Sequence, residues 1–252
     1  MNTPATAAIP TTQEPDPATL ERAFEALKTY DLGSGRAGVL PLDRAAAAAQ
    51  LDDSRRKQLE HRFLTALEDS SSSVARQYVC SKLALIGSEA AAPALAALLG
   101  EGPLCLAARN ALEAIPSEQA AKALRDSLPS LHGPAKAGVI NSLGARRDHN
   151  SVRVLARLLK DTDSSVAGAA AAALGNIGST KAGATLRAFQ PLAPEAIRQQ
   201  VADAVLTCAE RLRAGGARSA ARALYGLLAV PSQPAHIQTA ANQGLRACRG
   251  KG

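Results

Sequence analysis

Apolar residues recur along most of the chain at helical spacing, and the pattern itself repeats as a longer unit. Similar segments align when Gly87, Pro116, Arg147 and Gly178 are superimposed, which gives steps of 29, 31 and 31 residues. A fifth copy aligns at Gly216 after a step of 38 residues. Self-similarity at a period of about 20–50 residues is typical of solenoids and other repeat folds.

Each copy carries two apolar stripes, one before and one after its register residue. The spacing within each stripe fits one face of an α-helix. We therefore expect each copy to contain a helix A, a short turn and a helix B. The positions four residues before and eight residues after the register residue are leucine in every copy: Leu83, Leu112, Leu143, Leu174 and Leu212 in helix A, and Leu95, Leu124, Leu155, Leu186 and Leu224 in helix B.

The step before the fifth copy is seven residues longer than the one before it. Seven residues are about two helical turns, and we expect them to lengthen the A helix over residues 197–214. A sixth copy begins at Gln233 and stops before its second helix. Residues 70–252 are therefore predicted to form a solenoid of about five full repeats and a partial last one.

The upstream part of the chain is also helical in pattern but does not follow the repeat. Helices are expected at residues 18–30, 43–51 and 55–69, and four of the six aromatic residues lie before residue 79. Larger side chains suit a structure that closes the end of a stack, so residues 18–69 are predicted to be an N-terminal helical cap. Residues 1–17, rich in Pro, Thr and Ala, are predicted to be a disordered tail.

Composition narrows the fold class further. Aromatic residues make up 2% of the chain, and tryptophan is absent. Few aromatic and β-branched residues argue against a sandwich, a barrel or a doubly wound sheet. No apolar run approaches the length that a membrane-spanning helix needs. The predicted fold is an all-α, right-handed α-solenoid.

The stretch Asp161–Gly178 reads D-x-D-x-x-V-A-x-A-A-x-A-A-L-G-x-I-G, and Asp69–Gly87 matches it more loosely. This pattern resembles the bacterial HEAT repeat. The segments at 23–33, 78–88, 108–117 and 138–148 extend the resemblance to a family of bacterial multi-HEAT-repeat (armadillo-like) proteins. The resemblance implies stacked helix pairs, and members of the family are often exported and joined to other domains. Ala75 and Ala167 stand where many HEAT units carry arginine, so an inter-repeat Asp/Arg ladder is expected to be incomplete.

Catalytic and metal-binding patterns are missing from the sequence. None of the four histidines is followed by glutamate, which argues against a di-iron hydroxylase of this architecture. The few aromatic residues argue against a DNA glycosylase and against a phycobilin lyase. The four cysteines form no CxxC pair and are expected to be buried free thiols. No enzymatic activity, metal or cofactor is predicted.

Basic residues follow the outward positions of the predicted B helices, six and nine residues after the register residue. On a right-handed solenoid these helices are expected to line the concave wall. One interpretation is a solvated face that keeps the protein soluble. The other is a groove that binds an acidic protein or another anionic ligand, with nucleic acid disfavoured because stacking aromatics are missing. The candidate residues are Lys122, Arg125, Arg153, Arg157, Arg187 and Arg222.

A second basic motif, Arg146-Arg147-Asp148, lies in the predicted A–B turn of one repeat. One interpretation is structural: an arginine caps the last carbonyls of helix A, and Asp148 begins helix B. The alternative is that Arg146 and Arg147 present guanidinium groups to a partner, because their fork geometry suits carboxylates.

These observations predict a non-catalytic protein-interaction or scaffold module that binds its partner on the concave B-helix face. One alternative is an accessory, substrate-binding part of a fused or associated lyase- or hydrolase-type enzyme. Another is polyanion binding. The start of the sequence lacks the pattern of a signal peptide, which fits a cytoplasmic protein, or an exported one in which Met1 replaces a removed signal. The partner, the compartment, the oligomeric state and the natural end of the chain stay open.

Overall fold

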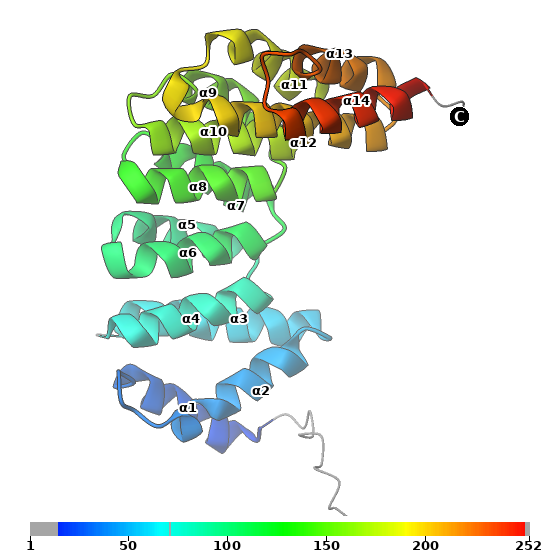
Figure 1. Cartoon of the computed structure of the whole chain (residues 1–252). Coiled ribbons are helices and arrows are strands. Elements are labelled where there is room, and N and C mark those ends of the chain that lie inside the picture. The colour runs from blue at the N-terminus through cyan, green and yellow to red at the C-terminus, as the bar shows by residue number, and fades with distance from the viewer. Residues whose placement is uncertain (1–14, 71, 250–252) are drawn as a thin grey trace, which may run out of the picture. The chain divides into compact units, whose positions relative to one another are not determined.

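The computed structural model describes residues 15–70 and 72–249. Most of the predicted disordered tail, residues 1–14, lies outside these ranges. The described residues form α-helices and short 3-10 helices without a strand, as the fold prediction requires (Figure 1). None of the helices in the described ranges is long and apolar enough to cross a membrane.

The α-helices follow one another with short connections. Their bounds are α1 (Pro17–Lys28), α2 (Leu40–Ala49), α3 (Asp53–Asp69), α4 (Ser73–Ile86), α5 (Ala92–Ala97), α6 (Gly102–Ala114), α7 (Glu118–Ser127), α8 (Gly133–Ala145), α9 (Val152–Leu158), α10 (Ser164–Ile177), α11 (Thr180–Phe189), α12 (Arg198–Ala214), α13 (Arg218–Leu228) and α14 (Ala235–Arg249). The 3-10 helices are η1 (Arg36–Gly38), η2 (Glu89–Ala91), η3 (Leu98–Gly100), η4 (His149–Ser151), η5 (Gln190–Leu192) and η6 (Glu195–Ile197).

The chain divides into two compact units, Met1–Ser117 and Glu118–Gly252. In the first, α4 packs between α3 and α6, with α1 and α2 against α3. In the second, α10 packs between α8 and α12, and α14 packs against α12 and α13. Both units are therefore stacks of helix pairs, and the fold is an all-α solenoid.

The predicted A–turn–B unit is confirmed in the helix order. The A helices are α4, α6, α8, α10, α12 and α14, and the B helices are α5, α7, α9, α11 and α13. The A helices α4, α6, α8 and α10 each begin 14 residues before their register residue. All ten leucines predicted for the repeating core positions are buried. Periodicity alone was therefore enough to place the core.

Small residues let neighbouring A helices of the second unit approach at the level of the backbone. A Cβ built on Gly144 of α8 would lie 2.7 Å from the Cα of Ala173 in α10. One built on Gly175 of α10 would lie 2.7 Å from the carbonyl oxygen of Ala204 in α12. Close packing of this kind explains why so few large side chains suffice for a core.

The structure corrects the prediction for the seven extra residues of the fifth copy. Helix α12 has 17 residues and α10 has 14, so only part of the insertion lengthens the helix. Most of the rest lies in the linker 190–197, which contains η5 and η6. Pro191 and Pro194 lack the N–H that a continuous helix needs there, which explains why the linker breaks into short turns.

Polar contacts and aromatic rings join the helices of the first unit. The rings of Phe24 and Phe63 lie 5.3 Å apart, which ties α1 to α3. The Tyr78 hydroxyl of α4 donates to Asp43 of α2 over 2.8 Å, and the Lys82 ammonium lies 2.6 Å from the same carboxylate. The buried Glu60 of α3 accepts hydrogen bonds from the N–H and the hydroxyl of Ser88.

Candidate interaction surface

Helices α9, α11 and α13 of the second unit form a basic surface. In sequence, these three B helices contain Arg153, Arg157, Lys181, Arg187, Arg218 and Arg222, and no Asp or Glu. Helix α11 lies between α9 and α13. Like charges on neighbouring helices leave a local positive potential that attracts acidic groups.

Four of the predicted site residues lie on this surface: Arg153, Arg157, Arg187 and Arg222. All four side chains are exposed. Among residues 15–70 and 72–249, none of the four forms an ion pair with a carboxylate. Their charges are therefore available to a partner.

The other two residues of the predicted stripe, on α7, are already paired. Lys122 forms an ion pair with Asp126 one turn further along the helix. The Arg125 side chain is 16% exposed and bonds to Asp148 over 2.8 Å and to Glu118. Burial alone would lower the pKa of Arg125, but the hydrogen bonds to these two carboxylates raise it. Arg125 joins α7 to the α8–α9 turn.

Tyr225 stands nine residues after Gly216, which is an outward position in the predicted register, but it does not lie on the open face. The side chain is fully buried, and its ring packs against Gly244 of α14, where a Cβ would overlap the ring. Its hydroxyl donates a hydrogen bond to Glu210 of α12, 2.5 Å away. The outward position on α13 is covered because α14 packs over it, which the pattern of α13 alone does not show.

The Arg146–Arg147 turn ends α8 with a Schellman motif. The N–H of Asp148 bonds the carbonyl of Leu143, and the N–H of Arg147 bonds that of Gly144. Arg147 has a φ of 52°, in the left-handed region where Gly178 and Gly216 stand in the next two turns. The Arg147 side chain is exposed, whereas Arg146 is half-buried. Of the two arginines, Arg147 is therefore the one whose side chain is more open to a partner.

Asp148 plays a different part from the predicted helix cap. It is the residue before η4, but its side chain makes no capping bond to the backbone of that helix. The carboxylate is buried and accepts hydrogen bonds from Arg125 and Ser151. The carboxylate therefore joins Arg125 of the preceding B helix to the start of the next one.

A shallow groove separates α11 from α13 within the basic surface. Its volume is about 140 Å³. Small residues on both helices leave this space open, above a floor of buried leucines. The lining residues are Thr180, Gly183, Ala184 and Arg187 of α11, Ala220, Ala223 and Leu224 of α13, and Leu212 of α12.

Ionic contacts join successive A helices at a repeating position that the sequence analysis missed. Arg76, near the start of α4, bonds Glu101 before α6 over 3.0 Å. Lys136 of α8 bonds Asp161 before α10 over 3.2 Å. Each pair is separated by 25 residues, so the register predicts both contacts once it is applied to charged residues.

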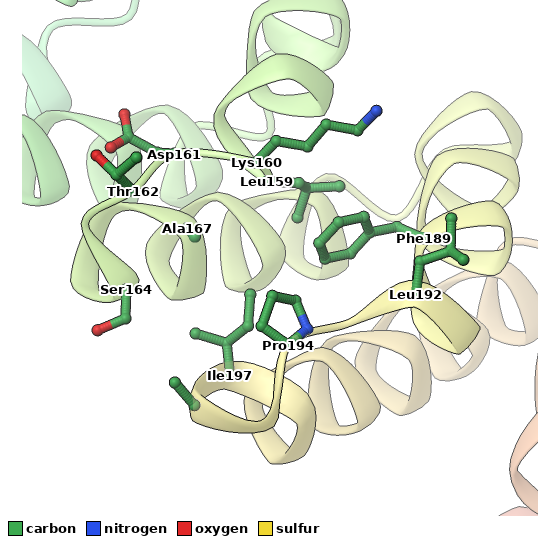
Figure 2. Close-up of a pocket in the computed structure, with 11 residues that line it drawn as sticks. Leu159, Lys160, Asp161, Thr162, Ser164, Ala167, Phe189, Leu192, Pro194 and Ile197 are labelled. Carbon is green, nitrogen blue, oxygen red and sulfur yellow. The ribbon is translucent and has the colours of Figure 1, made fainter.

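The same repeating position is apolar at the next step, where Ala167 and Leu192 replace the ion pair. A pocket of about 410 Å³ opens there, between the start of α10 and the linker 190–197. Figure 2 shows Phe189, Pro194 and Ile197 lining it together with the two replacement residues. Leu192 is 73% exposed. Ala167 is too short to reach across this gap, whereas Lys136 spans the equivalent gap one repeat earlier.

The prediction of buried thiols holds for two of the four cysteines. Cys80 and Cys208 are buried, and burial raises the pKa of each thiol to about 11. Cys105 and Cys248 are half-buried and free. In the part of the chain that the structure describes, no three His, Cys, Asp or Glu side chains lie close enough together to hold a metal ion.

Comparison with known proteins identifies the repeat. The HEAT repeats family matches residues 122–207. The fold is similar to that of an engineered protein solved by the Northeast Structural Genomics Consortium, at 22% identity and a TM-score of 0.40, over 75% of this chain and 96% of that one. No curated protein sequence matches the chain. HEAT repeats are typically protein-interaction scaffolds and are generally non-catalytic. The matched residues include the helix pairs α8–α9 and α10–α11, which lie in the same stack as the basic surface, so the repeats of this part of the chain are HEAT repeats.

Proposed function

We propose that the protein is an interaction module that binds an acidic region of a protein partner on the face formed by α9, α11 and α13. One observation carries the proposal. These three neighbouring helices contain six basic residues and no acidic residue. Elsewhere in the described structure, basic side chains such as Arg76, Arg125 and Lys136 have carboxylate partners.

Charge is the observation that favours this face. The concavity predicted for the B-helix face stays a prediction. Arginine suits such a face because its planar fork binds carboxylates with two hydrogen bonds.

Charge reversal of three of the exposed arginines tests the proposal. The variant Arg153→Glu/Arg187→Glu/Arg222→Glu should lose capture of the native partner from lysate. Its melting temperature should stay close to that of the wild type, because exposed charges contribute about 0–1 kcal/mol each. Capture by the wild type should weaken as salt rises, because screening shortens to about 3 Å at 1 M.

A matched control separates this face from net charge. Lys160, Arg246 and Arg249 are exposed and lie outside the three B helices. The variant Lys160→Glu/Arg246→Glu/Arg249→Glu changes the net charge by the same amount and should keep its partner. Equal loss of capture in both variants would show that only net charge matters. Equal retention would place the interaction elsewhere on the protein.

A further inference from the structure

The groove between α11 and α13 is small for a ligand pocket. Its volume of about 140 Å³ is several times the roughly 30 Å³ that one water occupies in the liquid. It is also well below the roughly 300–1,000 Å³ of small-molecule sites. A single aliphatic side chain matches this size.

Six of the eight residues that line the groove are apolar, and Thr180 and Arg187 are the polar ones. Leu212 and Leu224 form the floor and are buried. Gly183, Ala184, Ala220 and Ala223 form the walls. Because these residues offer little to a polar group, the groove favours a side chain that carries no charge of its own.

One edge of the groove is cationic. Arg187 lines it and lies three residues after Ala184, on the same side of α11. The Arg187 side chain is exposed, so a carboxylate next to an inserted apolar side chain would meet its guanidinium. Lys181 and Arg222 are exposed on the same two helices but do not line the groove.

We propose that this groove takes one aliphatic side chain of an acidic protein segment, and that a carboxylate flanking this side chain pairs with Arg187. The inference rests on the proposed function and adds the kind of segment that is recognised. A nucleic acid would use the charges but not the groove. The two aromatic side chains of the three B helices, Tyr225 and Phe189, are both buried and so offer no exposed ring for base stacking.

Fluorescence polarisation with defined probes tests the inference on the full chain. The first probe is a short labelled peptide with one leucine between glutamates, and the second replaces that leucine with serine. The leucine peptide should bind about tenfold more tightly, as expected for one buried aliphatic side chain. A third probe, labelled single-stranded oligothymidine of equal charge, should bind more weakly than the leucine peptide.

Filling the groove provides the matched variant. Ala223 and Ala188 are both exposed helix residues, but only Ala223 lines the groove. Ala223→Leu should abolish the preference for leucine over serine, and Ala188→Leu should leave it unchanged. Arg187→Glu should weaken both peptides.

The outcomes distinguish the two proposals. Equal binding of the leucine and serine peptides, with both still weakened by Arg187→Glu, would overturn the groove and leave the basic face standing. Insensitivity of both peptides to Arg187→Glu and to salt would overturn the proposed function as well. Tighter binding of oligothymidine would overturn the assignment to an acidic protein segment.

Discussion

Gly144 of α8 lies against Ala173 of α10 so closely that no side chain fits between them. A Cβ on Gly144 would be 2.7 Å from the Cα of Ala173 and 2.9 Å from its Cβ. Backbone atoms line the contact, so the two helices would have to separate to admit a methyl group. Gly144→Ala should therefore lower the free energy of unfolding by about 1–3 kcal/mol, the range for overpacking a core, as measured by urea denaturation.

A second glycine provides the control for that substitution. Gly226 lies in α13, and a Cβ added there would meet nothing within 4 Å. Gly226→Ala should raise the free energy of unfolding by about 0.5–1 kcal/mol, because alanine loses less conformational entropy in a helix. If both substitutions stabilise the protein, the A helices are not in backbone contact.

The left-handed conformation of Arg147 predicts a stabilising substitution. An L-residue in this region costs roughly 1–2 kcal/mol relative to the right-handed form, and φ is 52° at Arg147. Arg147→Gly should therefore raise the free energy of unfolding by about 0.5–1 kcal/mol. Gly216→Ala is the converse experiment, because φ is 82° there and nothing lies within 4 Å. It should be destabilising, and a stabilising effect would contradict the assigned turn.

The contact between Arg125 and Asp148 should contribute more to stability than a surface ion pair. Asp148 is buried, and the Arg125 side chain is 16% exposed. Asp148→Ala should lower the free energy of unfolding by about 1–3 kcal/mol, since it leaves the buried Ser151 hydroxyl without its acceptor and Arg125 with Glu118 alone. Lys122→Ala, which removes an exposed pair, should cost no more than about 0.5 kcal/mol. Thermal melts of the two variants compare the effects, and equal losses would argue against the role of Asp148.

The contact between Lys136 and Asp161 should make the free energy of unfolding depend on pH in the acid range. The Asp161 carboxylate accepts a hydrogen bond from the Asp163 N–H and pairs with Lys136. Both contacts hold the pKa of Asp161 below its ordinary value. A carboxyl whose pKa is lowered in the folded state stabilises that state at pH values above the unfolded pKa of about 3.9. This contribution is lost as the pH falls from there through the folded-state pKa. The melting temperature of Asp161→Asn should fall less steeply than that of the wild type below about pH 4. Parallel curves would show that Asp161 is not involved.

Sequence periodicity predicted the helix order and the core because both follow from spacing within single helices. The buried leucines from Leu83 to Leu224 are an example. Sequence periodicity did not predict the contacts between helices. Tyr225 is buried because α14 contributes Gly244, and Arg125 is neutralised because the α8–α9 turn contributes Asp148. The Arg76–Glu101 contact could have been predicted from the sequence, because it occupies the same position in the repeat as Lys136–Asp161.

The insertion before α12 marks another limit of the pattern. The seven extra residues suggested two more helical turns. Part of them instead lies in the linker beside the apolar pocket, because Pro191 and Pro194 interrupt the helix there. Proline fixes φ and removes a donor, so a count of residues alone does not tell where a helix begins. The pocket itself depends on Ala167 and Leu192, which lie in different elements.

Site-specific photo-crosslinking tests the central claim most directly, because it reports which face touches the partner. A photoreactive amino acid is placed at Ala188 on α11 or at Ala172 on α10, which are both exposed, and the protein is irradiated in lysate. The account predicts a crosslinked protein from Ala188 but not from Ala172, with the crosslink mapping to an acidic segment of that protein and vanishing in the Arg153→Glu/Arg187→Glu/Arg222→Glu variant. Crosslinking from Ala172 alone, or from Ala188 with no effect of the charge reversal, would contradict it.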